Sequence, residues 1–501
     1  MNGHVLKPAG YIYIIEKYGL KVIQPYHTSF ISDSSYSKQI LKDGYIEEVY
    51  SKKYLPDHSV LANLEFALKY DGTDLGVIAA FFETVGKDEI AGYITSKPTG
   101  KYARIIWFLY EFITGERLPL EDMVMGNYVQ VLDVEKYYTA EPGVRVQRQR
   151  VVNNFLGVKN FCPVIRRIEG LKKYTNSEIN DRCQKLTRSY PPSLLRRALS
   201  YLYTKETKSS FEIENVKPGP AKTESFVELL KSAERKDFCD KNSLIELQKS
   251  IVDKRFLNDG YRETQNYVGQ TAAYDKEIIH YICPKPEDVS SLMDGLLLAA
   301  SKMRDSGVTA FVQAAAISYG FVFIHPFDDG NGRIHRFLIH NILYLSGAVP
   351  EGLMFPVSAV MLKNMIEYDR SLEAFSKPLN KLIDYSMDSN GKMKVENETA
   401  RFYKYPDMTD QVQALGRFID LTIENELTRE LDFLIHYDIV KNEMSQVVEM
   451  PDNTADLLIK LCVQNGGILS ARKKKDHFNF LNENETEQLH KIIREHLEYL
   501  R

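Results

Sequence analysis

The chain has 501 residues, 44% of them apolar and 26% charged, a composition typical of globular proteins that excludes collagen-like, low-complexity and disordered classes. At roughly 100 to 200 residues per domain, this length predicts three or four domains. The 64 Lys and Arg residues nearly balance the 68 Asp and Glu residues, giving a net charge of −4. No overall field would therefore attract nucleic acid or an anionic membrane.

The N-terminal part, residues 1–190, is predicted to be a mixed α/β region, and its role stays open. Roughly its first 90 residues mix β-branched and aromatic runs such as Tyr11–Ile15 with turn signals at Asp71-Gly72 and near Gly76. A helix is expected from Arg104 to Ile113, ending at Gly115. Because no basic segment followed by an apolar one opens the chain, we expect no signal peptide and a cytoplasmic location.

Two groups of residues in this part invite other interpretations. A basic cluster between Arg145 and Lys173 could bind nucleic acid, but a solvated face is the favoured interpretation in a near-neutral chain. The five cysteines of the whole chain are odd in number, widely scattered and without a C-x-x-C pair. We expect reduced, mostly buried thiols rather than disulfides or a zinc site.

From Pro191 onward the apolar residues recur at helical spacing. Further helices are expected over 225–233, 243–252, 289–303, 308–324 and 333–346. The segments 266–269 and 278–282 predict a β-hairpin that projects from the helical body. Residues 308–324 are apolar enough to raise the question of a membrane span, but Thr309, Gln313 and Ser318 interrupt them, so a buried core helix is favoured.

The C-terminal part, residues 377–501, is predicted to be helical, with long helices over 410–426 and 428–448. The run from Arg472 to Lys475 resembles the basic wing of a small DNA-binding domain, although exposed lysines near a terminus need no such explanation. The organisation expected is an N-terminal region 1–190, a short helical segment 191–220, a catalytic domain 221–376 and the C-terminal region.

The stretch from His325 to Arg336 carries the chemistry. It reads H-P-F-D-D-G-N-G-R-I-H-R and joins the long apolar helix to a second helix that starts near Asn331. The first turn of the second helix offers unpaired backbone N–H groups and the positive end of the helix dipole. Phosphate binds readily at such a position, so we expect this loop to hold an anion.

Several side chains of this stretch suit a polyphosphate. Gly330 and Gly332 let backbone amides approach the anion, and Asn331 can add a side-chain donor. Arg333 and Arg336 stand three residues apart on one helical face, so both guanidinium groups can reach the same polyphosphate.

The remaining two residues suit a metal and a proton transfer. Asp329 supplies a hard oxygen for Mg²⁺, and His325, with an ordinary pKa near ~6.5, can take a proton from a hydroxyl. Each residue alone could be a helix cap or part of a turn. The whole pattern H-x-F-x-[DE]-G-N-G-R-x-x-R, however, is expected by chance on the order of 10⁻⁸ times in such a chain. Nucleotidyl or phosphoryl transfer is therefore predicted.

This stretch resembles the signature of Fic-domain proteins, enzymes that mostly transfer AMP from ATP to a protein hydroxyl, and it matches at every specified position. The resemblance implies a mainly α fold: a helical Fic core with a β-hairpin flap, here preceded by the mixed α/β region and followed by the helical C-terminal region. It assigns the role of general base to His325. It assigns to Asp329 the binding of a Mg²⁺ ion that bridges the α- and β-phosphates. Phe327 would point into the helical core.

The same resemblance implies which residues of the loop and of the following helix bind each phosphate of ATP. Asn331 and the amides of Gly330 and Gly332 would hold the α-phosphate. Arg333 would stabilise the β-phosphate side, and Arg336 would contact the γ-phosphate. An intact Gly332-Arg333 favours AMP transfer over the phosphotransferase branch of the family, which has Lys in place of this glycine.

Two further regions agree with the resemblance to this family. The hairpin 266–282 resembles the flap that binds an extended stretch of the target by strand addition, with Val268, Gly269 and Ile282 as expected docking positions. Tyr368 resembles a residue that lines the adenosine site.

A second motif concerns control. Residues Ser210 to Asn215, S-F-E-I-E-N, are similar to the family's inhibitory helix [ST]-x-x-x-E-[GN], whose Glu pairs with the second arginine of the signature. About 0.5 chance matches to this motif are expected in a chain of this length. The position of the motif upstream of the core therefore supports the assignment more than its residue types do. Ser210 and Glu214 are therefore the expected inhibitory residues, with Glu214 facing Arg336.

The expected function is a protein adenylyltransferase, with ATP as co-substrate, Mg²⁺ as cofactor and a Tyr, Ser or Thr hydroxyl of a target protein as acceptor. Self-modification and a homodimer are left open, while a membrane partner is excluded and nucleic acid is disfavoured. Three alternatives stay open at this point. They are AMP removal or another nucleotide or phosphoryl transfer at the same site, a DNA-binding regulator built on the C-terminal region, and a scaffold that binds nucleotide without turnover.

Overall fold

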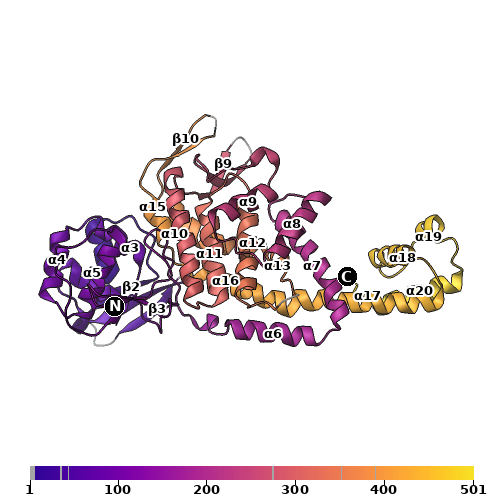
Figure 1. Ribbon diagram of the computed structural model, residues 1–501, viewed down its shortest axis with the longest axis horizontal. Coiled ribbons are helices and arrows are strands. Elements are labelled where there is room, and N and C mark those ends of the chain that lie inside the picture. The colour runs from indigo at the N-terminus through magenta and orange to yellow at the C-terminus, as the bar shows by residue number, and fades with distance from the viewer. Residues whose placement is uncertain are drawn as a thin grey trace, which may run out of the picture. The chain divides into compact units, whose positions relative to one another are not determined.

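The structure is a computed structural model that describes residues 6–33, 37–42, 44–272, 276–350, 353–389 and 391–500. The chain divides into two compact units. The first comprises Met1–Asn176, Glu228–Ser346 and Asn364–Gly416, and the second comprises Ser177–Val227, Gly347–Lys363 and Arg417–Arg501. The mainly helical architecture with a mixed N-terminal region, a β-hairpin and a helical C-terminal region is confirmed (Figure 1).

The N-terminal part of the first unit joins a small sheet to a group of helices. The sheet has the order β1 (Lys7–Ala9), β2 (His27–Ser32), β4 (Tyr45–Ser51) and β3 (Lys38–Lys42), and the pair β2–β4 is parallel. The helices are α1 (Gly10–Tyr18), α2 (Val60–Tyr70), α3 (Leu75–Phe82), α4 (Lys87–Ser96) and α5 (Lys101–Thr114). Apolar side chains of these helices form one buried core that excludes water, which stabilises the region.

Two local expectations in this region are settled by capping residues. The helix predicted at 104–113 is confirmed as α5, which ends at Gly115 in the left-handed conformation. The turn predicted near Gly76 is wrong, because Gly76 lies inside α3. The side chain of Asp74 accepts a hydrogen bond from the N–H of Val77 at 2.9 Å and so starts the helix before the glycine.

A three-stranded sheet and a long irregular segment follow α5. The strands are β5 (Val129–Gln130), β7 (Val151–Asn153) and β6 (Val144–Val146), in that spatial order. Arg148, from the basic cluster, is not solvated: its guanidinium pairs with Glu111 at 3.0 Å and lies over the Trp107 ring. This arginine therefore supports the local packing.

The helical core of the first unit lies around α11 (Ala310–Ile324), in which every residue except Val322 is buried. It packs against α10 (Pro286–Asp305) and α12 (Asn331–Leu345), and Figure 1 shows the three side by side. The first unit also contains α9 (Lys241–Ile251), α14 (Met365–Asn380), α15 (Ala400–Lys404) and the first part of α16 (Thr409–Leu421), which continues into the second unit from Arg417. The predicted core helices are thus confirmed, and among the described residues no helix is both long and apolar enough to cross a membrane.

The N-terminal region is joined to this core by close backbone contacts. Asn160 and Phe161 approach α10 and α11 at two glycines: a Cβ on Gly295 would lie 2.7 Å from the Asn160 carbonyl carbon, and one on Gly320 would lie 2.5 Å from the Phe161 ring. Further along, the N–H of Cys162 donates to the Lys404 carbonyl at 2.7 Å. The two parts therefore form one folding unit.

The second unit is built from helices stabilised by ion pairs. It includes most of α6 (Asn176–Arg188) and all of α7 (Pro192–Glu212), α13 (Val357–Lys363), α17 (Thr428–Val447), α18 (Asp452–Gln464), α19 (Ala471–His477) and α20 (Glu483–Glu495). A π-helical turn, Thr422–Leu427, precedes α17. Within it the buried Glu426 pairs with both Lys205 and Lys363, so two cations compensate one buried carboxylate.

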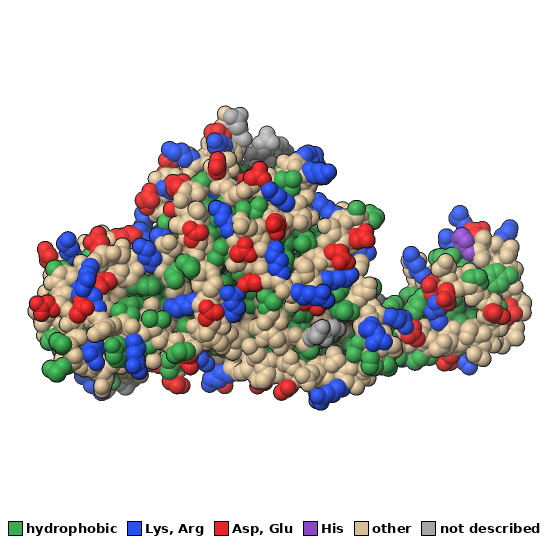
Figure 2. Space-filling view, in the orientation of Figure 1, with side chains coloured by type: hydrophobic (Ala, Val, Ile, Leu, Met, Phe, Trp, Pro, Cys, Tyr) green, Lys and Arg blue, Asp and Glu red, His purple; other side chains and the backbone are tan. Residues whose placement is uncertain are grey.

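Two expectations about cysteines and basic residues are also settled. All five cysteines are free and four are buried, as predicted. The comparison of Arg472–Lys475 with a basic wing is wrong, because these residues lie in helix α19, whose N-terminus is capped by Ser470. Across residues 428–500, all of them described, there is no strand from which a wing could be made. On the face shown in Figure 2, basic and acidic side chains are interspersed, in keeping with the near-neutral composition.

Candidate active site

The signature residues form the loop between α11 and α12. His325 ends α11 in the left-handed conformation, with φ 52°, and its N–H donates to the Phe321 carbonyl. Phe327 is completely buried, as predicted, and so fixes the middle of the loop in the core. Gly330 has φ 93° and packs against Val252, where a Cβ would come within 2.8 Å of a methyl carbon. Glycine is therefore required here both for its conformation and for space.

Short-range hydrogen bonds hold the loop in shape. The Asn331 side chain accepts from the Phe327 N–H at 3.1 Å and donates to the Phe327 carbonyl at 2.7 Å. Asp329 Oδ1 accepts from the Gly330 N–H at 2.6 Å and from Arg333 at 2.7 Å. Because both polar groups of the Asn331 side chain are used within the loop, its direct contact with an α-phosphate stays a prediction.

The first turn of α12 retains the features of an anion site. Gly330 is the residue before the helix, and Asn331, Gly332 and Arg333 are its first three residues. Their N–H groups lie before the point at which a helix can supply carbonyl partners, and they point along the positive end of the dipole. The start of α12 thus lies where the sequence predicts it, and phosphate binding there stays a prediction.

His325 is placed as a neutral base. Its Nδ1 lies 3.1 Å from the Val322 carbonyl, so the assigned tautomer donates from Nδ1 and leaves Nε2 as an acceptor. Burial lowers the pKa of His325 to about 4, while the Val322 carbonyl acts in the opposite direction. The imidazole is therefore neutral at pH 7 and able to accept a proton.

The two signature arginines are buried beside the loop. Arg333 is 3% exposed and donates to the Ile251 carbonyl at 2.8 Å in addition to Asp329. Arg336 is 2% exposed and lies 3.5 Å from the hydroxyl of Tyr368. The structure thus brings Tyr368, 32 residues further along the chain, to the second arginine of the signature.

The residues present are suitable for Mg²⁺ when a polyphosphate supplies further ligands. Asp329 is partly exposed, and among the described residues no hydrogen bond to its Oδ2 is found, whereas Oδ1 has two partners. The described part of the chain gathers no group of three or more His, Cys, Asp and Glu side chains that could hold a metal alone. Mg²⁺ commonly binds through one or two carboxylates plus substrate phosphates, so the donor set fits that mode.

Arg262 is the residue that sequence reasoning missed. It is 3% exposed, and its guanidinium donates to three carbonyls: those of His325 at 2.8 Å, Thr264 at 2.7 Å and Pro284 at 2.7 Å. Its own N–H donates to the Pro326 carbonyl. Arg262 therefore connects the catalytic loop to both ends of the hairpin, and a single arginine outside any periodic pattern offers no signal of this in the sequence.

A second missed contact supports the acidic side of the loop. The buried Gln248 side chain donates to the Phe256 carbonyl at 2.8 Å and lies 3.4 Å from the Asp329 carbonyl. Asn258 donates to Asp328 at 2.8 Å. These amides hold the segment after α9 against the loop.

The predicted hairpin is confirmed as β8 (Tyr267–Ala272) and β9 (Lys276–Ile282), which pair antiparallel with an irregularity between Val268 and Gly269. Val268 is 40% exposed, as a docking position requires. Ile282 is 1% exposed, with its N–H bonded to Asn380 and its carbonyl to Tyr403. Ile282 thus holds the base of the hairpin, and its role in docking a target stays a prediction.

The expected inhibitory residues belong to the second unit. Ser210 is buried in the last turn of α7, and the Glu214 N–H donates to the Phe211 carbonyl at 3.1 Å in the turn that follows. Asn215 has φ 57°, the left-handed conformation that Asn and Gly adopt most easily. This explains the last position of the motif as a helix end, while the pairing of Glu214 with Arg336 stays a prediction.

Comparison with known proteins identifies relatives of this region. The model of the Fic/DOC family matches residues 238–343. A Fido domain-containing protein of Dictyostelium discoideum is 31% identical over 118 residues, which are 23% of this chain and 71% of that protein. A protein adenylyltransferase Fic of Culex quinquefasciatus is 33% identical over 121 residues, 23% of this chain and 22% of that protein.

The chain thus spans about a fifth of the Culex relative's length. Among solved structures, the crystal structure of a Fic domain-containing signalling protein from Bacteroides thetaiotaomicron covers 51% of this chain and 95% of its own, with 15% identity and a TM-score of 0.38.

Proposed function

We propose that this chain, which belongs to the Fic/DOC family, transfers AMP from ATP to a Tyr, Ser or Thr hydroxyl of a protein. The observation that carries this proposal is the state of His325. Its Nδ1 is bonded to the Val322 carbonyl, which leaves Nε2 of a neutral imidazole as an acceptor on the loop that leads into α12. A base next to an anion site is what a hydroxyl needs to attack a bound phosphate.

The proposed reaction is a single displacement at the α-phosphorus. Nε2 of His325 takes the proton of the target hydroxyl as its oxygen bonds to the α-phosphorus. The bond between that phosphorus and the oxygen bridging to the β-phosphate breaks, and diphosphate leaves. The negative charge of bound ATP would raise the pKa of His325 from its low value toward neutrality, which makes the imidazole a better base.

The residues around the loop are proposed to hold the leaving group. The backbone amides of Asn331 and Gly332 would bind the α-phosphate, with Arg333 on the β-phosphate and Arg336 on the γ-phosphate. Mg²⁺ bound through Asp329 would neutralise phosphate charge and favour in-line attack. Arg333 is already paired with Asp329, so the acid and this arginine are positioned before the nucleotide arrives.

The hairpin is proposed to position the target. A peptide could add its main chain as a further strand beside β8, with side chains next to the exposed Val268 and the irregularity at Gly269. Because Arg262 bonds both ends of the hairpin and the catalytic loop, a bound strand would be held in register with His325.

Control by the second unit is part of the proposal. If Glu214 pairs with Arg336, the arginine cannot hold the γ-phosphate, and ATP binds with its α-phosphate misaligned. Ser210 would support the helix end through its hydroxyl. The unmodified chain would then have low activity.

The test is incubation of the purified chain with Mg²⁺, ATP labelled at its α-phosphate and a lysate of its own cells. A labelled band whose size differs from that of the purified chain indicates a target protein. Label on the chain itself indicates self-modification. His325→Ala should lose ~10² to 10⁴ in rate, the usual cost of losing a general base, while nucleotide binding persists. The matched control is His58→Ala, since His58 is an exposed histidine before α2. Equal labelling by the two variants would refute the role of His325.

A further inference from the structure

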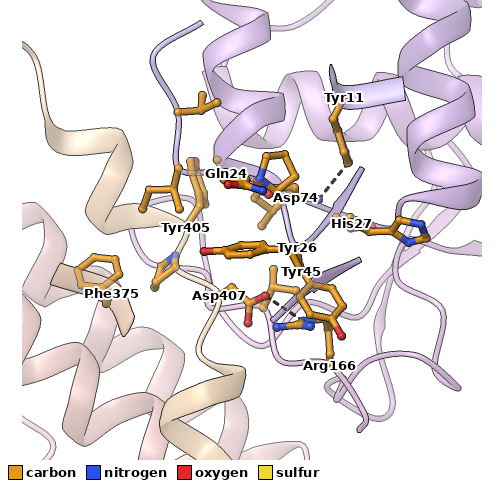
Figure 3. Close-up of a pocket in the computed structure, with 18 of the residues that line it drawn as sticks. Tyr11, Gln24, Tyr26, His27, Tyr45, Asp74, Arg166, Phe375, Tyr405 and Asp407 are labelled. Carbon is orange, nitrogen blue, oxygen red and sulfur yellow. Dashed lines mark hydrogen bonds and ion pairs between the residues drawn. The ribbon is translucent and has the colours of Figure 1, made fainter. Parts of the chain in front are cut away.

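A pocket separate from the catalytic loop lies within the first unit, between the N-terminal region and the segment around α15 (Figure 3). Its volume is about 280 Å³, close to the lower end of the ~300–1,000 Å³ range of small-molecule sites. The N-terminal wall includes residues 22–27 and 71–76, and the opposite wall includes residues 401–407. The proposed reaction uses none of these residues.

Aromatic rings form much of this pocket. Figure 3 shows the rings of Tyr26, Tyr45 and Tyr405 around the space, with Phe375 on the side of the helical core. The guanidinium of Arg166 lies 3.2 Å from the centre of the Tyr26 ring. Aromatic faces attract cations, and the face of Tyr26 is already in contact with one, the guanidinium of Arg166.

Acidic side chains outnumber basic ones in the lining. The lining holds four aspartates and two arginines: Asp71, Asp74, Asp407 and Asp410 with Arg166 and Arg401. Burial raises the pKa of Asp71 to about 8, so this carboxyl is mostly neutral at pH 7 and three charged acids stand against two arginines. The one histidine, His27, has its pKa lowered by burial and adds no charge at pH 7. Burial also raises the pKa of Asp74 to about 6, although the N–H groups of Val77 and Gly76 and the charge of Arg166 act in the opposite direction.

Both arginines are already engaged. Arg166 donates from Nε to Asp407 at 3.0 Å, and Arg401 donates to Glu83 and to the Lys21 carbonyl. Asp410, which like Asp407 is exposed, differs from it because none of the described residues donates a hydrogen bond to the Asp410 side chain. Burial, and after it the charges of Asp410 and Asp407, raise the pKa of Tyr45, which places this ring close to both acids.

We propose that this pocket binds a small organic cation, a primary amine on an aromatic or aliphatic body. Its ammonium group would lie between the carboxylate of Asp410 and the ring of Tyr45, and its apolar part would pack against Tyr26 and Tyr405. A ligand of this kind supplies the positive charge that the aspartates lack and the apolar surface that the rings accept. An anion of equal size would meet the carboxylates of Asp74, Asp407 and Asp410 and is disfavoured.

The test is calorimetric titration of the full chain with three compounds of nearly the same shape. Tyramine carries the ammonium group, tyrosol carries a neutral hydroxyl in its place, and 4-hydroxyphenylacetate carries a carboxylate; agmatine serves as an aliphatic cation. At least one of the two amines should bind at about 1 mM or below, and tyramine should bind about tenfold more tightly than tyrosol. The carboxylate compound should not bind.

Variants locate the site. Asp410→Asn should weaken amine binding about tenfold, whereas Asp305→Asn, which removes an exposed carboxylate of α10, should leave it unchanged. Tyr45→Leu should weaken binding and Tyr45→Phe should preserve it. Failure of both amines to bind at about 1 mM, equal binding of tyramine and tyrosol, or unchanged binding in Asp410→Asn would overturn the proposal. Because no turnover is measured, the result does not depend on AMP transfer.

Discussion

Replacing Arg262 by methionine tests how the catalytic loop is positioned. The substitution keeps most of the side-chain volume and removes the guanidinium, so three carbonyls lose their donor: those of His325, Thr264 and Pro284. A buried polar group left without a partner costs ~1 to 3 kcal/mol. These carbonyls lie near one another and their losses are not additive, so we expect a total of about 3 to 5 kcal/mol of unfolding free energy.

The loss of rate should be measurable on protein that is still folded. Typical domains have ~5 to 15 kcal/mol of stability, so the variant should still fold. Its loop, however, loses its bond to the hairpin, and a misplacement of ~1 Å can cost on the order of 10²-fold in rate. The assays are calorimetric unfolding and transfer of labelled AMP, measured on the same preparation.

Two controls separate position from charge. Arg255→Met removes an arginine whose side chain is 79% exposed and should leave stability nearly unchanged. Arg262→Lys keeps the charge but replaces three nitrogens, each bonded to one carbonyl, by a single ammonium nitrogen, so it should recover only part of the lost stability. If Arg262→Met matched Arg255→Met in both assays, the positioning role would be refuted.

Three further changes have directions set by the structure. Asp329→Ala should shift the Mg²⁺ dependence of AMP transfer to higher concentration, with partial recovery at high Mg²⁺, measured by titration of the labelling rate. Glu214→Gly should produce self-modified chain, seen by intact mass, and adding Arg336→Ala should abolish that gain, because the arginine is what the glutamate would occupy. Acid should loosen helices α18 to α20, because burial lowers the pKa of His436 and His490. The unfolded state therefore binds more protons than the folded state, and stability falls as the pH drops below about 6.5. Amide hydrogen exchange measures this loss.

Each of these expectations has a contradicting result. An unchanged Mg²⁺ titration would exclude Asp329 as a ligand. Equal masses for the unmodified chain and Glu214→Gly would leave residues 210–215 as an ordinary helix end. The acid effect rests on two contacts: the Leu469 N–H donates to the imidazole of His490 at 2.8 Å, and the Nδ1 atoms of His436 and His496 lie 2.8 Å apart. Equal amide protection of α18 to α20 at pH 7.5 and pH 5 would exclude a role for these histidines.

The catalytic loop was predictable because its contacts are local. Asn331 bonds Phe327 and Asp329 bonds Arg333, each four residues apart, and Gly330 takes a conformation that glycine favours. Such interactions are determined by the order of neighbouring residues. The same holds for α11, whose apolar run and terminal His-Pro define it, and for the hairpin, whose two β-branched segments are close in sequence.

The start of α3 shows where local signals compete. A glycine favours a turn, but Asp74 supplies the N-terminal cap and the following apolar residues are buried, so Gly76 becomes helical. Burial of a whole helix face outweighs the cost of one glycine, which is about 1 kcal/mol. The sequence contains both the turn signal and the helix signal, but it does not show which of the two is stronger.

Only the tertiary structure decided which distant residues meet at the sites. Arg262 reaches the His325 carbonyl across 63 positions, Tyr368 reaches Arg336 across 32, and Arg166 reaches Asp407 across 241. These pairs have no common period or spacing, because they arise from the packing of helices and loops that the chain order does not constrain. By itself, the sequence predicted which groups would react and determined the local shape of their loop. The packing of the first unit determined what holds that loop in place and created the acidic aromatic pocket.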